Sequence, residues 1–228
     1  MNKQIKRFCV TGIIVMFVCY FFAQVSFASV WGNWRECASA PGCSCTLTFQ
    51  VTQSTVSTLK TYIVESAGYF LKSHATYQDF LSLVEMTDLN GVDYKEMRAI
   101  LYSTVDNMEK AKASYANLKA AAEKIPNDPF VIDKLLKFDY DSFQVKYGLI
   151  EPIFEKVKSL LSKGDIAGLD NVMLANMDII LNQLYEVKNL VDKEQSPDIS
   201  LLWRINQTYA EAQLFGQYMS EVFRDILF

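Results

Sequence analysis

The residue types that could do chemistry in this chain gather in one short stretch near the N-terminus. Cys37, Cys43 and Cys45 lie within nine residues of one another. Between the first two stands Pro41-Gly42, a pair that favours a turn. In an oxidising compartment we expect a disulfide from Cys37 to Cys43 or Cys45, because a bond between Cys43 and Cys45 would close a strained ring. One thiol then remains, for a partner chain, a metal ion or no partner.

His74 is the only histidine in the chain, so any mechanism that needs an imidazole depends on it. The pattern places it at the end of a predicted first helix, where the helix dipole favours a histidine. The alternative is a metal site made by His74 together with Cys37, Cys43 and Cys45.

The sequence lacks the motifs of common catalytic and cofactor sites. It has no Gly-x-Ser-x-Gly elbow, no Glu-x-x-His pair for a di-iron centre, no Cys-x-x-Cys-His haem motif and no glycine-rich phosphate loop. We therefore expect a protein that is not an enzyme and carries no cofactor.

The N-terminus has the features of an export signal. Lys3, Lys6 and Arg7 precede an uncharged run, residues 8–25, and Ser26-Phe27-Ala28 then offers small residues at a cleavage site. Residues 1–28 are thus a predicted signal peptide, and the mature protein is expected in the periplasm or secreted.

An uncleaved anchor is the alternative to cleavage. The apolar run is roughly 18 residues, close to the ~20 that span a bilayer. Trp31 and Trp34 follow it, where interfacial aromatic residues would lie. In this case residues 8–28 would hold the protein in the inner membrane, which is the one circumstance in which we expect a membrane contact.

Composition narrows the possible partners. Removal of residues 1–28 leaves 19 basic and 26 acidic side chains, a net charge of −7. No basic face that could neutralise phosphates is evident, which argues against nucleic acid. We expect other envelope or secreted proteins as partners, or a second copy of the chain.

Almost everything after the cysteines has a helical period. Residues 29–46 are predicted to be an irregular, cysteine-bearing arm, and residues 47–228 a single helical domain. Apolar residues spaced by three and four indicate a first helix at about 48–72 and a short second helix near 75–86.

The strongest helical pattern follows Asp93. Asp93 and Glu96 have the spacing of a capping box. An a/d seam without a slip then runs to Pro126, and its members are Met97, Leu101, Thr104, Met108, Ala111, Tyr115, Leu118, Ala122 and Ile125. We expect Leu101 and Leu118 to be buried.

Three more long helices are predicted after Pro126. One spans residues 129–161 with a kink or one-turn break at Gly148 and Pro152. The next begins at a cap residue, Asp165, and the last follows a cap-plus-proline pair, Ser196-Pro197. The expected fold is all-α. It is an elongated, antiparallel up-down bundle of four long helices, preceded by one or two shorter packing helices and the arm.

Aromatic residues are dense on the kinked helix. A ligand cavity could open there, lined by Phe143, Tyr147 and Phe154 and faced by Met173 or Met177 from the following helix. The alternative is that these side chains simply fill the core.

Two functional hypotheses follow. The first is a non-catalytic exported bundle that acts as an interaction or structural component of the cell envelope. The second is a periplasmic or secreted carrier that binds a small apolar ligand in the bundle core or a metal at the cysteine cluster.

Overall fold

The fold is all-α, as the sequence predicts. The computed structural model describes residues 53–86, 93–124, 127 and 129–227, and the secondary structure within these ranges is helical. The helices are α2 (Gln53–Met86), α3 (Tyr94–Ala122), α4 (Pro129–Lys137), α5 (Tyr140–Tyr147), α6 (Glu151–Leu161), α7 (Ile166–Asp192) and α8 (Ile199–Leu227). The predicted signal peptide and the cysteine-bearing arm lie outside the described residues.

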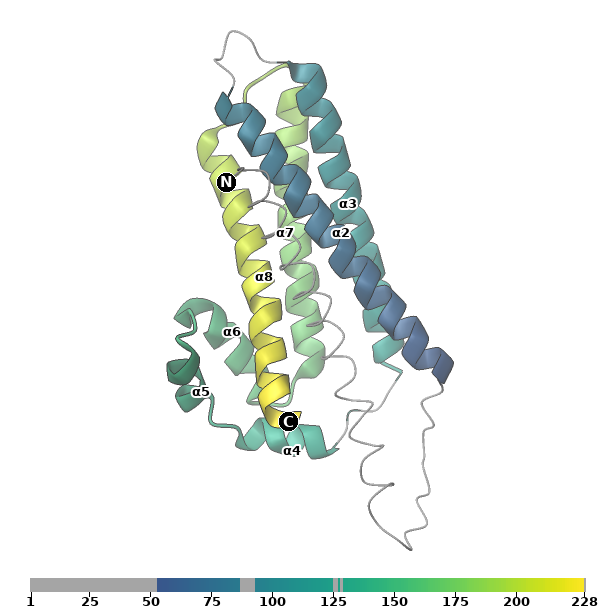
Figure 1. Cartoon of the computed structure of the whole chain (residues 1–228), viewed down its shortest axis with the longest axis vertical. Coiled ribbons are helices and arrows are strands. Elements are labelled where there is room, and N and C mark those ends of the chain that lie inside the picture. The colour runs from purple at the N-terminus through teal and green to yellow at the C-terminus, as the bar shows by residue number, and fades with distance from the viewer. Residues whose placement is uncertain (1–52, 87–92, 125–126, 128, 228) are drawn as a thin grey trace, which may run out of the picture.

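Four long helices make up the body of the molecule. Figure 1 shows α2, α3, α7 and α8 lying lengthwise beside one another, with the short helices α4, α5 and α6 gathered at one end. Helix α3 packs against α2 on one side and α7 on the other, and α7 packs against α8. The short helix α6 contacts both α7 and α8, and α4 contacts α8.

Two of the predicted helix starts are confirmed and one is wrong. The Asp93 carboxylate accepts hydrogen bonds from the backbone N–H groups of Lys95 and Glu96 at 2.9 and 3.2 Å. Asp165 likewise caps α7, through the N–H of Gly168 at 2.9 Å. At the last helix the cap is Asp198 instead of Ser196, because the Asp198 carboxylate and carbonyl accept the first N–H groups of α8.

The predicted seam of α3 forms part of one continuous core. Leu101 is fully buried and Leu118 is 5% exposed, so both predictions of burial are confirmed. The other seam residues from Met97 to Tyr115 are buried as well. Because the apolar pattern is regular over many turns, it specifies a single face of α3 as the buried face.

The predicted break between residues 72 and 75 is wrong, because α2 continues through it. The hydroxyl of Thr76 donates to the Lys72 carbonyl one turn earlier at 2.9 Å, within the helix. The hydroxyl of Ser73 donates to the Thr104 carbonyl of α3 at 2.8 Å. These polar residues are therefore satisfied inside a helix, and His74 lies in the middle of α2, where no helix end can favour it.

The predicted long helix over residues 129–161 is also wrong, since three short helices occupy that range. Gly148 adopts φ +60° and ends α5, and Pro152 lies in the first turn of α6, so the predicted break at this point is confirmed. A second break was missed. Asp139 caps α5 by accepting the Ser142 N–H at 3.1 Å, and the chain turns away from α4 there.

Candidate functional site

Polar side chains form one continuous set across three long helices, which we call the polar belt. Its members are Ser73, His74, Thr76, Tyr77 and Gln78 of α2, Thr104 of α3, and Asn206 and Tyr209 of α8. Four of them, Ser73, Tyr77, Thr104 and Tyr209, are completely buried. Buried polar groups are costly unless they are hydrogen-bonded, so the partners of each one matter.

The hydroxyl protons of the belt can be assigned by counting donors. The Ser73 hydroxyl donates its single proton in a hydrogen bond to the Thr104 carbonyl at 2.8 Å. In the 2.6 Å contact between the Ser73 and Tyr209 hydroxyls, Tyr209 must therefore be the donor. The Thr104 hydroxyl lies 2.9 Å from that of Thr76 and 3.0 Å from the Ile100 carbonyl, so it too has partners. The hydroxyls thus tie α3 to α2 and α2 to α8.

The two buried tyrosines of the belt stay neutral. Tyr77 donates to the Leu202 carbonyl of α8 at 2.6 Å. Burial raises the pKa of Tyr77 and of Tyr209 far above the usual value for a phenol. Both hydroxyls therefore stay protonated near neutral pH and act in the belt as hydrogen-bond donors.

His74 lies at the outer end of the belt and is half-buried. Its ring stacks on Tyr209 with centroids 4.7 Å apart and an angle of 8° between planes. The Gln78 side-chain amide nitrogen lies 3.1 Å from His74 Nε2 and also donates to the Asn206 carbonyl oxygen. As an amide NH₂ only donates, Nε2 accepts, and this arrangement assigns the imidazole proton to Nδ1. Burial lowers the pKa of His74, and the neighbouring Asn206 side chain opposes this with a smaller effect.

A different set of polar contacts joins α3 to α7. The Tyr115 hydroxyl donates to the Asp170 carboxylate at 2.8 Å, and burial is the main cause that raises the pKa of both groups. Further contacts are Tyr102 with Asp192, Tyr185 with Glu109, Lys112 with Asp178, and Arg98 with Asp192 and Glu194. This side of α3 is therefore bonded through charged groups, while the belt is bonded through neutral ones.

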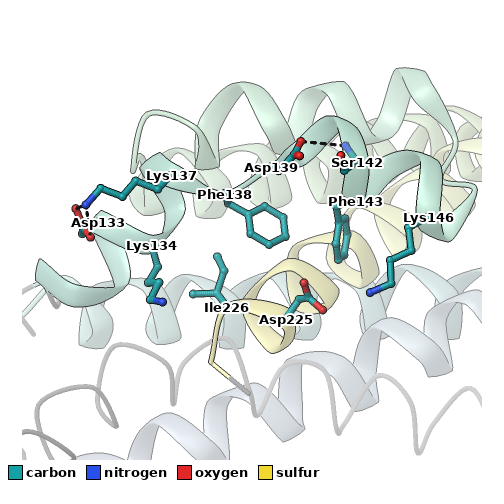
Figure 2. A pocket seen from close by; sticks show the side chains of 10 residues that line it. All are labelled: Asp133, Lys134, Lys137, Phe138, Asp139, Ser142, Phe143, Lys146, Asp225 and Ile226. Atoms are coloured by element: carbon teal, nitrogen blue, oxygen red, sulfur yellow. Dashed lines mark hydrogen bonds and ion pairs between the residues drawn. The ribbon is translucent and has the colours of Figure 1, made fainter.

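A pocket of about 640 Å³ opens where α4 and α5 meet the C-terminal end of α8. Figure 2 shows Phe138 and Phe143 facing Asp225 and Ile226 of α8 across it, with lysines and aspartates around them. The full lining is Asp133, Lys134, Lys137, Phe138, Asp139, Ser142, Phe143, Lys146, Asp225 and Ile226.

Several charges at this pocket have partners within its own wall. Lys137 pairs with Asp133 at 2.7 Å. The hydrogen bonds that Asp139 accepts from Ser142 lower the pKa of the Asp139 carboxyl. The wall has three lysines and three aspartates in total, so the pocket has no strong preference for a ligand of one charge.

The structure brings together part of the predicted aromatic cavity. Phe143 lies against Tyr147 and Phe154, with ring centroids 4.6 and 6.0 Å apart. Phe154, Met173 and Met177 are buried in the core. Of the five predicted residues, only Phe143 lines the pocket. The sequence offered no signal for Asp225 and Ile226, because they are some eighty residues away along the chain and reach α5 only through the fold.

The predicted metal site cannot be assembled from the part of the chain that the structure describes. Cys37, Cys43 and Cys45 lie outside the described residues, so the disulfide and the metal hypotheses both stay predictions. Within the described ranges, no three His, Cys, Asp or Glu side chains gather as metal ligands would.

Comparisons with protein-family models, with curated proteins and with solved structures found no match for this chain. Among the helices described, none combines the length and the apolar character that crossing a membrane requires. Arguments about function therefore rest on the residues of this chain alone.

Proposed function

We propose that this protein is a non-catalytic, exported helical bundle that acts as an interaction or structural component of the cell envelope. The antiparallel up-down order of its long helices, which short connections favour, belongs to this proposal. So do the cleaved signal peptide and a disulfide in the cysteine-bearing arm. The protein would function by binding through its surface to other envelope or secreted proteins or to a second copy of the chain.

The observation that carries the proposal is a pair of large apolar side chains on the outside of α8. Ile199 and Trp203 lie one turn apart on that helix and are 61% and 58% exposed. A tryptophan gains much from burial and is enriched at the centres of protein interfaces. Exposed neighbours of this kind mark a surface on which another protein can pack.

The test replaces these two side chains and leaves the core alone. Ile199→Ser combined with Trp203→Ser removes the apolar pair, and Val64→Ser, at another exposed apolar position on α2, is the matched control. We expect the double variant to weaken self-association, or cross-linking to envelope proteins in the native host, by about tenfold or more. Equal behaviour of the double variant and Val64→Ser would contradict the proposal.

A carrier is the second candidate, and the pocket beside Phe143 is the observation that favours it. A cavity of this size is within the range that holds small ligands. Native mass spectrometry of protein purified from its host would show a retained ligand. A thermal-shift screen of apolar and aromatic compounds gives a second readout, since a ligand at a hundredfold its dissociation constant adds about 2.7 kcal/mol of stability. No ligand in either experiment would leave the interaction proposal as the better one.

A further inference from the structure

The contact between α2 and α8 is built differently from the other long-helix contacts. It depends on side chains that reach across from each helix, with Tyr209 at the centre. The Tyr209 ring lies 5.6 Å from Phe70, 5.6 Å from Tyr77 and 4.7 Å from His74, centroid to centroid. His74 is therefore one of three α2 rings that hold Tyr209, and it is the one that can titrate near neutral pH.

The groups that face His74 are neutral. From α8 it meets the Tyr209 ring and the Asn206 amide, and from α2 it meets the Gln78 amide and lies beside Tyr77. From α3 the belt receives the hydroxyl and the backbone carbonyl of Thr104, which are neutral as well. Both tyrosines remain protonated because burial raises their pKa values.

The charged side chains that are close to His74 in sequence are directed away from its ring. Lys72 Nζ lies over the Tyr69 ring at 5.5 Å, and Asp79 is exposed. Among the described residues, the recorded contacts of His74 include no carboxylate that could pair with an imidazolium. A proton on this ring would thus place a positive charge in a half-buried, neutral contact, where the charged form is disfavoured.

Protonation would also change the hydrogen bond at Nε2. In the present arrangement Nε2 accepts from Gln78, whose amide also donates to Asn206. A proton on Nε2 turns that acceptor into a donor. The protonated ring would lose the hydrogen bond from Gln78, and the Asn206 carbonyl oxygen that accepts from Gln78 would be drawn toward the ring. One proton therefore disturbs both helices of the contact.

We propose that His74 makes the α2–α8 contact acid-sensitive, so that acidification of the exported protein loosens α2 from α8 while α2 stays attached to α3. The α2–α3 contact holds because its buried hydrogen bonds run from hydroxyls to carbonyls, from Ser66 to Ala111 and from Ser73 to Thr104, and these groups do not titrate. The device responds as the pH falls below 6.5, the pKa of a free histidine.

The direction of the effect follows from linkage. The folded state lowers the pKa of His74 below the 6.5 of a free histidine. Above pH 6.5 the ring is neutral in the folded and in the unfolded state, so its titration does not change the free energy of unfolding. As the pH falls below 6.5 the unfolded chain binds the proton first, so stability falls until the pH reaches the folded pKa. Between 6.5 and the folded pKa, each pH unit of acidification multiplies the unfolding equilibrium constant by up to about ten.

The experiment uses the fact that the chain has one histidine. An NMR titration of its ring in the mature protein, with EDTA present to exclude metal binding, reports the folded midpoint directly. We expect a midpoint below 6.5, with the Asn206 and Gln78 side-chain amides shifting in step with the ring. A midpoint at or above 6.5 would overturn the proposal and needs no variant.

A matched variant separates His74 from the carboxylates. His74→Phe keeps an aromatic ring on Tyr209 but cannot titrate. Urea unfolding at pH 7.5 and 5.0 should show a larger loss of stability for the natural chain than for His74→Phe, and equal losses would contradict the proposal. Hydrogen-exchange protection factors, which correct for the slower intrinsic exchange at low pH, should fall at pH 5.0 in α2 and α8 around residues 70–80 and 202–209. A fall in α3 and α7 instead would also contradict it.

Discussion

Helix α2 contacts two neighbours in two different ways. Against α3 it presents two small residues, Ser66 and Ser73, whose hydroxyls reach directly to backbone carbonyls of α3. Against α8 it presents Phe70, His74 and Tyr77, whose rings surround Tyr209. Small side chains let two helix backbones approach closely, whereas large rings keep them apart and fill the space between.

The difference predicts how each contact responds to change. A close contact between small residues tolerates loss of a methyl or hydroxyl group but not added volume. A contact built from rings tolerates small shifts, yet it depends on the few rings that fill it. The α2–α3 contact should therefore be sensitive to larger residues and the α2–α8 contact to smaller ones.

The largest effect is expected at the centre of the ring contact. Tyr209→Ala removes a fully buried ring with three aromatic neighbours, and it should lower the free energy of unfolding by about 3–5 kcal/mol in urea denaturation. Tyr209→Phe is its control. It keeps the ring and loses one hydrogen bond to Ser73, for about 0.5–1.5 kcal/mol. If both variants cost the same, the hydroxyl and not the ring would hold α8 to α2.

Truncation on α3 tests the core that both contacts share. Leu101→Ala and Leu118→Ala should each cost about 2–5 kcal/mol, the usual range for a buried leucine. Leu101 is the more deeply buried of the two, so its variant should lose more. A change below ~1 kcal/mol at both positions would show that this seam packs against another molecule in solution and not within the chain.

Added volume tests the α2–α3 contact. Ser66→Leu should destabilise the protein by about 1–3 kcal/mol, because Ser66 is fully buried and its hydroxyl lies 2.9 Å from the Ala111 carbonyl. Ser66→Ala keeps the volume small and should cost about 1 kcal/mol for the lost hydrogen bond. A stabilising Ser66→Leu would mean that the two helices have room between them, and the contrast with α8 would fail.

The smallest effect is expected at the α3–α7 contact, where a carboxylate is half-buried. Burial is the main cause that raises the pKa of Asp170, so its charged form is the disfavoured one in the folded state. The Asp170 carboxyl therefore contributes most to the free energy of unfolding at a pH below the pKa of a free aspartate. This contribution is lost as the pH rises through the pKa of Asp170 in the folded state. Relative to Asp170→Asn, the natural chain should lose stability between pH 4 and 7 in thermal unfolding. A constant difference across that range would contradict the assignment.

Prediction from the sequence succeeded where one local signal decided the structure. The caps at Asp93 and Asp165 and the end of α5 at Gly148 each depend on a residue and its neighbours within one turn. The a/d seam from Met97 to Leu118 is equally local, because its period alone shows which face is buried. These features were confirmed.

Prediction failed where a distant helix changed the local outcome. The sequence pattern predicts a helix end between residues 72 and 75, where Ser73 and His74 lie. In the structure their side chains bond to α3 and α8, and the helix continues. The aromatic run from Phe138 to Phe154 looked like one face of a long helix, and instead it lies on helices that turn at Asp139 and Gly148. The pocket beside Phe143 could not be foreseen, because Asp225 and Ile226 complete it from the far end of the chain.

The helical character of this protein, the caps at Asp93 and Asp165 and the buried face of α3 are thus determined by the sequence itself, since each arises from interactions within one or two turns. The continuity of α2, the place of His74 against Tyr209 and the walls of the end pocket were decided only by the tertiary structure. The physical reason is that a polar or aromatic side chain has several partners of similar energy. Which partner it meets depends on helices that lie up to 136 residues apart in sequence, as Ser73 and Tyr209 do.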